Sequence, residues 1–124
     1  MRRQIAFLAL AITFVVISLS MMIDWIPPRS MTLTALRETA TRIGIYFQRN
    51  KALPVNLNVL PIREGYTNRT TDGWKRPLTY RIDTNDTFTL SSLGRDGKVG
   101  GTGDDADTSC QYQIINGEAR VRER

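Results

Sequence analysis

An uncharged apolar run from Ile5 to Ile23 constrains this chain more than any other part of its sequence. The run is interrupted by only three polar residues, Thr13, Ser18 and Ser20. As a helix it would measure about 28 Å, close to the ~30 Å hydrocarbon core of a bilayer. It therefore predicts a transmembrane anchor over residues 5–23, with a basic cytoplasmic stub at residues 1–4 and a linker at residues 24–29.

Charges at the two ends of the run predict its orientation. Arg2 and Arg3 precede it and Asp24 follows it, which favours a cytoplasmic N-terminus. A cleaved secretory signal is the alternative, with Ser18-Leu19-Ser20 as the cleavage site. The run is longer than the roughly 7–15 apolar residues of typical signals, so the anchor is favoured. Either reading exports residues 30–124.

Composition makes an enzyme the least expected class. The chain has no histidine and one cysteine, which excludes a Ser/His or Cys/His nucleophile pair. Its formal net charge of +5 is matched by five arginines at the two ends, Arg2, Arg3, Arg120, Arg122 and Arg124. No basic stripe interleaved with aromatic residues is present, so a nucleic acid partner is not expected. Cys110 is predicted to be a small buried residue, with an intermolecular disulfide as the alternative.

Downstream of the apolar run, residue spacing predicts one helix. Pro27-Pro28 breaks the chain, and Ser30 or Thr32 is expected to cap a helix that runs to about Asn50. Its charged residues, Arg42 among them, are expected to face water. Its buried stripe is expected to comprise Leu33, Leu36, Ala40, Ile43 and Phe47.

The second half of the chain predicts a small antiparallel sheet. Alternation over residues 78–82 places Leu78, Tyr80 and Ile82 on one face, and residues 88–90 form the second strand of a hairpin. Further strands are expected at residues 110–114 and 118–121. Before the sheet, a short helical turn is expected at residues 57–60, and Trp74 is expected to be a packing anchor. The prediction is an α+β domain over residues 30–124.

The segment least like helix or strand is SLGRDGKVGGTGDDAD, residues 92–107. It holds five of the nine glycines and four of the eight aspartates. Glycine permits positive φ, so carbonyls and carboxylates can turn inward and form an oxygen-rich cage. Such a cage suits calcium better than magnesium, zinc or copper. The alternative is a solvated turn in which Arg95 and Lys98 neutralise the aspartates.

This string resembles the C-terminal calcium loop of the major pseudopilins of bacterial type II secretion systems, the protein G family. Residues 53–61 and 72–80 are similar to the same family's "LP…DxWGxPxxY" stretch. The resemblance covers roughly residues 34–108. It implies a pilin-like fold and a stabilising Ca2+ ion bound by the carboxylates of Asp96, Asp105 and Asp107. In the predicted site Asp104 is a candidate for one more carboxylate, and the carbonyls of Leu93 and Lys98 complete the set of ligands.

The resemblance also implies a structural role. A family member would be a single-pass protein of the bacterial inner membrane with its C-terminal domain in the periplasm. It would contact other pseudopilins or secretion-system subunits and form a homo-oligomer through its N-terminal helix. Family members carry a basic leader ending in glycine and then a glutamate in the apolar segment, whereas here no acidic residue precedes Asp24 and no glycine precedes Gly44.

That departure predicts an anchored relative rather than a standard major subunit. The alternative function is an independent membrane-anchored or secreted calcium-binding module that binds a periplasmic or surface ligand. A reading frame extending upstream of Met1, with a leader and a glutamate, would favour the filament subunit.

Overall fold

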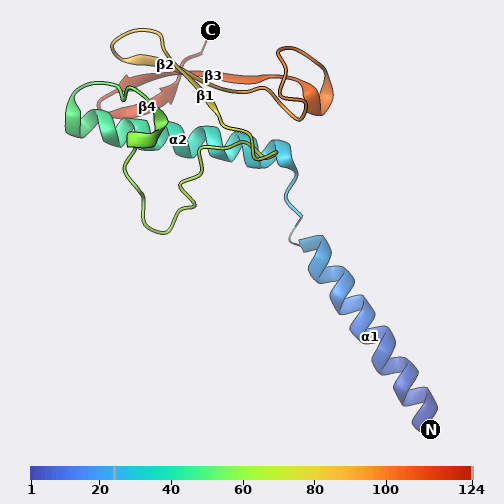
Figure 1. The fold of residues 1–124 in the computed structure, drawn as a ribbon. Coiled ribbons are helices and arrows are strands. Elements are labelled where there is room, and N and C mark those ends of the chain that lie inside the picture. Colours follow the sequence, from blue (N-terminus) through green and yellow to red (C-terminus); the bar gives the residue numbers. More distant parts are fainter. Residues whose placement is uncertain (24, 124) are drawn as a thin grey trace.

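The structure, a computed structural model, describes residues 1–23 and 25–123 and has an α+β layout (Figure 1). Its elements are α1 (Arg2–Ile23), α2 (Pro28–Asn50), η1 (Leu57–Val59), β1 (Thr79–Ile82), β2 (Thr87–Ser92), η2 (Gly103–Asp105), β3 (Thr108–Ile115) and β4 (Glu118–Val121). The four strands form one antiparallel sheet in the order β1-β2-β3-β4, and α2 packs on one face of it. The predicted fold class is confirmed, and we call α2 with the sheet and its loops the body.

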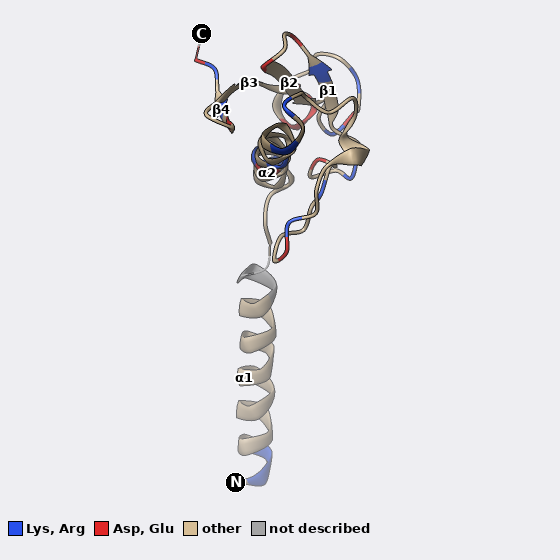
Figure 2. Cartoon of the chain, turned by 90° about the vertical axis from the view of Figure 1, so that its left-hand side faces the viewer, with Lys and Arg blue, Asp and Glu red and all other residues tan. Residues whose placement is uncertain are grey.

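α1 stands apart from the body in Figure 1 and is long and apolar enough to cross a membrane. Residues Arg2–Ser20 have a mean hydropathy of 1.9, and none of that span is buried. Figure 2 shows basic residues only at the N-terminal end of this helix. The Thr13 hydroxyl donates to Ala9 O at 2.9 Å, so this polar group is satisfied within the helix, as a bilayer core requires.

α2 begins at Pro28, which corrects the predicted capping residues. Pro27 occupies the N-cap, and Pro28 takes the first helical position, where its missing N–H leaves no bond unmade. The Thr32 hydroxyl instead donates to Pro28 O and accepts from Gly73 N, each at 2.9 Å. A Cβ on Gly73 would overlap the Pro28 backbone, so only glycine lets this turn approach the start of α2.

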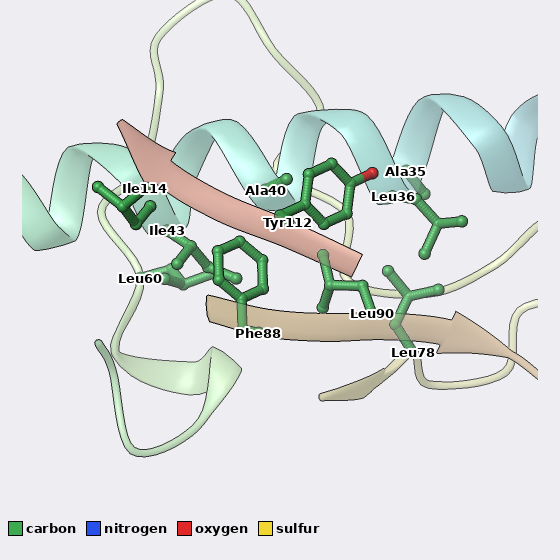
Figure 3. Close-up of a cluster of buried hydrophobic side chains, with 10 residues drawn as sticks. All are labelled: Ala35, Leu36, Ala40, Ile43, Leu60, Leu78, Phe88, Leu90, Tyr112 and Ile114. Atoms are coloured by element: carbon green, nitrogen blue, oxygen red, sulfur yellow. The ribbon is translucent and has the colours of Figure 1, made fainter. Parts of the chain in front are cut away.

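The core lies between α2 and the sheet (Figure 3). Phe88 and Leu90 of β2 are fully buried and face Leu36 and Ile43 of α2. Among the described residues, the buried hydrophobic cluster comprises Ala35, Leu36, Ala40, Ile43, Leu60, Leu78, Phe88, Leu90, Tyr112 and Ile114. The backbone of α2 also approaches β4 closely, because a Cβ on Gly44 would lie 3.2 Å from Ala119 N.

Four predicted core residues lie outside this cluster: Phe47 and Tyr80 are half-buried and pack against it, whereas Leu33 and Ile82 do not. Leu33 is 49 % exposed and Ile82 is 47 % exposed. Ala35 and Thr39 are buried on α2, so the covered face of the helix is turned toward them. Leu33 therefore lies at the margin of that face. Ile82 is the last residue of β1, a strand at the edge of the sheet. Spacing assigned both residues to an apolar face, but the covered area ends before it reaches them.

Arg42 is buried, which corrects the prediction that it faces water. Its side chain is only 5 % exposed. Its guanidinium donates to three carbonyls of the loop that crosses α2, with distances of 3.3 Å to Leu60 O, 2.9 Å to Pro61 O and 3.1 Å to Asn68 O. Burial lowers the pKa of Arg42 from its usual value, and the nearby charge of Glu38 opposes that shift. Arg42 therefore holds this loop on the helix.

Candidate metal-binding loop

The predicted cation site is the connection between β2 and β3, residues 93–107, which we call the acidic loop. β2 and β3 are paired neighbours, with Ser92 opposite Thr108, so the sheet brings the two ends of the loop together. Gly94 has φ 75° and Gly101 has φ 94°, values that favour glycine. A Cβ on Gly94 would lie 2.8 Å from Asp104 O, and one on Gly101 would lie 2.7 Å from Asp105 O. Carbonyl oxygens of the loop therefore pack closely against the backbone of Gly94 and Gly101.

The four aspartates of the loop have different partners. Asp96 Oδ1 accepts from Lys98 N at 3.0 Å, and Asp107 Oδ2 accepts from Gly100 N at 3.0 Å. The Asp105 carboxylate accepts hydrogen bonds from Nε and Nη2 of Arg95. Asp104 is exposed, and its backbone carbonyl accepts from Arg95 N at 2.8 Å. Within the described residues, no three carboxylates converge into a group that could hold a metal ion.

The two residues expected to supply carbonyl ligands lie at different places on the loop. Leu93 is half-buried and directly follows β2, so the sheet positions it. Lys98 is exposed and follows Gly97, which has φ 66°. The structure therefore places all six predicted ligand residues in one loop.

Arg95 is the positively charged residue of this loop that pairs with Asp105. Its Nε lies 3.0 Å from Asp105 Oδ1, and its Nη2 lies 3.2 Å from Asp105 Oδ2. The hydrogen bond to Asp105 and then the charge of Asp105 raise the pKa of Arg95, and the charges of Asp104 and Asp96 add to the effect. The loop thus contains an all-oxygen donor set, closely packed carbonyls and a cation already paired with one carboxylate. The chemistry of these groups fits a hard cation such as calcium.

Asp72 anchors the acidic loop to the rest of the body, a contact that sequence reasoning missed. Its carboxylate is 1 % exposed and accepts from Trp74 N at 2.9 Å and Arg76 N at 3.0 Å. It also accepts from Ser92 Oγ at 2.7 Å, and that oxygen accepts from Gly94 N at 3.1 Å. The sequence marked residues 72–73 as a turn, but only the fold brings Ser92 against it. Trp74 itself is half-buried and lies outside the core cluster.

A second turn contact supports the same loop. Arg76 Nη2 donates to Arg95 O at 3.0 Å. A Cβ on Gly97 would clash with the Arg76 guanidinium, so glycine there leaves room for this arginine. The turn at residues 72–76 therefore positions both the start of the acidic loop and the arginine that pairs with Asp105.

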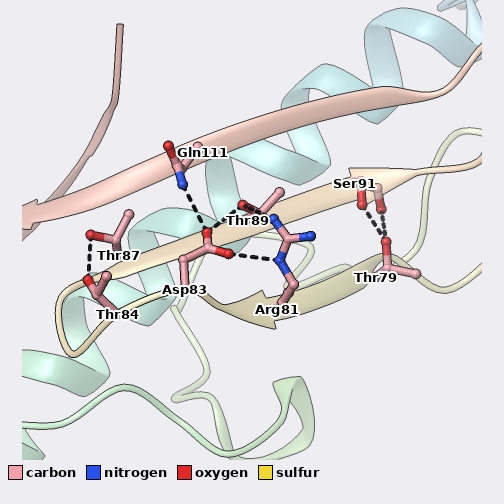
Figure 4. A network of polar contacts seen from close by, with 8 residues as sticks. All are labelled: Thr79, Arg81, Asp83, Thr84, Thr87, Thr89, Ser91 and Gln111. Carbon is pink, nitrogen blue, oxygen red and sulfur yellow. Dashed lines mark hydrogen bonds and ion pairs between the residues drawn. The ribbon is translucent and has the colours of Figure 1, made fainter. Parts of the chain in front are cut away.

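A polar cluster around one further carboxylate, that of Asp83, lies on the face of the sheet away from α2 (Figure 4). Asp83 accepts from the Thr89 hydroxyl at 2.6 Å, from Gln111 Nε2 at 3.1 Å and from Arg81 Nε at 2.7 Å. The Thr89 hydrogen bond is the largest cause of a lowered pKa at Asp83, partial burial opposes it, and Gln111 and Arg81 add to it. The Asp83 carboxylate is thus occupied in joining three neighbouring strands, β1, β2 and β3, which is a structural role.

Comparison with known families covers most of the body. A family model described as type II secretion system (T2SS), protein G matches residues 25–111, more than half of the chain. No curated protein matches the sequence. The matched residues contain α2, β1, β2, the turn at residues 72–76 and the complete acidic loop.

Proposed function

Because this chain belongs to the type II secretion system protein G family, we propose that it is a pseudopilin-like structural subunit of a type II secretion or type IV pilus-like system. The proposal rests on the family match from Trp25 through the acidic loop to Gln111, which covers most of the body. The body has the layout that a pilin-like subunit needs, an amphipathic helix packed on an antiparallel sheet. The family is structural rather than enzymatic.

The apolar helix α1 supplies the proposed anchor. Its length and apolar composition suit the inner membrane, with residues 30–124 as a periplasmic domain beyond a short linker. In this arrangement the exposed apolar surface of α1 is available for other pseudopilins and for further copies of the chain. Association of helices within a bilayer depends on close side-chain packing rather than on hydrophobic burial.

Cysteine cross-linking in membranes tests this role. The full chain with Cys110→Ser removes the single native thiol, and Val16→Cys then places a thiol in the middle of α1. We expect oxidation to yield disulfide-linked dimers when the secretion system is expressed. The control is Val55→Cys, at a residue 80 % exposed on a loop of the body, which should yield far fewer dimers. Equal yields from the two positions would contradict packing through α1 and favour the independent membrane-anchored module.

We propose further that calcium stabilises the body through the acidic loop. Asp96, Asp105 and Asp107 would supply carboxylates, with Asp104 and the carbonyls of Leu93 and Lys98 completing the site. A bound calcium ion would supply positive charge where four carboxylates lie within twelve residues. The acidic loop connects β2 to β3. A cation that stabilises the loop would therefore also stabilise the register of these two strands.

Thermal unfolding of the full chain in detergent micelles tests the calcium proposal. At about 100 times the dissociation constant, a ligand that binds only the folded state stabilises it by about 2.7 kcal/mol. Each kcal/mol raises the midpoint of a domain this small by about 4–8 °C. We expect that rise with calcium and not with magnesium at equal concentration. Asp105→Asn should abolish most of it, and an unchanged rise in this variant would contradict the proposed ligand set.

A further inference from the structure

Arg95 lies close to the aspartates of the acidic loop and pairs with Asp105. Its backbone N–H donates to Asp104 O, and its backbone carbonyl accepts from Arg76. Its guanidinium forms a bidentate ion pair with Asp105. These contacts fix the residue at both its backbone and its side chain. A bidentate arginine contact uses both oxygens of the carboxylate, so those oxygens are not free to bind another cation at the same time.

We propose that Arg95 is a built-in cation of the acidic loop that competes with calcium for the carboxylate of Asp105. The inference rests on the calcium role proposed above and adds what controls occupancy of the site. In the absence of calcium, the guanidinium offsets the repulsion among the aspartates and keeps the loop closed. Calcium coordination by Asp105 requires that the guanidinium first release it.

The exposure of the pair makes such a release feasible. The Arg95 side chain is 60 % exposed and that of Asp105 is 31 % exposed. An ion pair in contact with solvent is screened and contributes little to folding, so it can open without unfolding the body. The released guanidinium can reach water directly and needs no new protein partner. A divalent ion, with twice the charge, then competes for the same oxygens.

This competition has two consequences of opposite sign for Arg95→Gln. Without calcium, the variant loses the internal cation and its loop should be less stable than that of the wild-type chain. With calcium, the carboxylate of Asp105 is free from the start, so the ion should bind more tightly. A purely structural role for Arg95 would instead lower stability under both conditions.

The test measures calcium affinity and thermal midpoint for the full chain in detergent micelles, in the wild type, Arg95→Gln and Lys98→Gln. Lys98→Gln is the matched control, because it removes the same charge from the same loop. Lys98 bonds Asp96 through its backbone N–H, which the substitution leaves in place. We expect Arg95→Gln to lower the calcium dissociation constant by up to about fivefold, the equivalent of one exposed ion pair. It should also lower the midpoint in chelator and enlarge the rise that calcium produces.

The outcomes separate the two proposals. Equal affinity gains in Arg95→Gln and Lys98→Gln would overturn competition at Asp105 and point to net charge alone. Calcium binding by the wild type with no gain in Arg95→Gln would overturn the inference and leave the calcium role standing. No calcium response in any of the three chains would overturn both, whereas the cross-linking test of the pseudopilin-like role does not depend on calcium.

Discussion

Phe88→Ala is expected to lower the free energy of unfolding by about 3–5 kcal/mol, the range for removing a buried aromatic ring. Phe88 has no exposed surface and lies on β2, between β1 and β3. Its ring stacks on Tyr112 with a centroid distance of 5.4 Å and contacts Tyr80 at 6.0 Å. Alanine would leave a cavity between the sheet and α2 that neither layer can close, because neighbouring strands hold the β2 backbone in place.

Chemical denaturation of the full chain in detergent micelles measures this effect. The control is Val55→Ala, since Val55 is 80 % exposed and should lose well under 1 kcal/mol. Burial also raises the pKa of Tyr80 to about 12, and the phenol of Tyr80 donates to Pro54 O at 2.8 Å. A loss at Phe88 no larger than that at Val55 would mean that the sheet and α2 do not enclose this ring.

Asp72→Ala is expected to destabilise the chain by about 3 kcal/mol, because one buried donor and two partly buried donors lose their acceptor at once. The donors are Trp74 N, Arg76 N and Ser92 Oγ, all within 3.0 Å of the carboxylate. Of the described buried side-chain polar atoms, none lacks a hydrogen-bond partner in the native structure. The substitution would therefore introduce a defect that the fold otherwise avoids.

The loss at Asp72 should also reach the acidic loop. Ser92 Oγ connects Asp72 to Gly94 N, so the start of the loop would lose its support. We expect trypsin to cleave after Arg95 or Lys98 faster in Asp72→Ala than in the wild type under native conditions. Glu64→Ala, at an exposed residue of another loop, is the control and should leave both stability and cleavage unchanged. Similar behaviour of the two variants would contradict the anchoring role.

Local sequence patterns determined most of the elements. The apolar run predicted α1, because nineteen uncharged residues can satisfy their backbone in a membrane only as a helix. Alternation predicted β1 and β2, and the strand at Glu118–Val121 was located to the residue. The short turn after Asn56 was also correctly predicted, and it is the 3₁₀ helix Leu57–Val59. These features depend on neighbours within a few residues, which a sequence displays directly.

Contacts between distant residues were decided only by the tertiary structure. Spacing on the helix placed Arg42 toward water, but a loop 18 to 26 residues away covers it and accepts all three of its hydrogen bonds. Asp72 read as a turn residue, and only the pairing of β2 with β3 and the packing of the turn bring Ser92 to it. The family resemblance predicted which aspartates of the loop could be ligands. Only the folded loop showed that Asp105 pairs with Arg95. Side-chain partners follow from which segments pack together, and that depends on the free energy of the whole chain rather than on any local pattern.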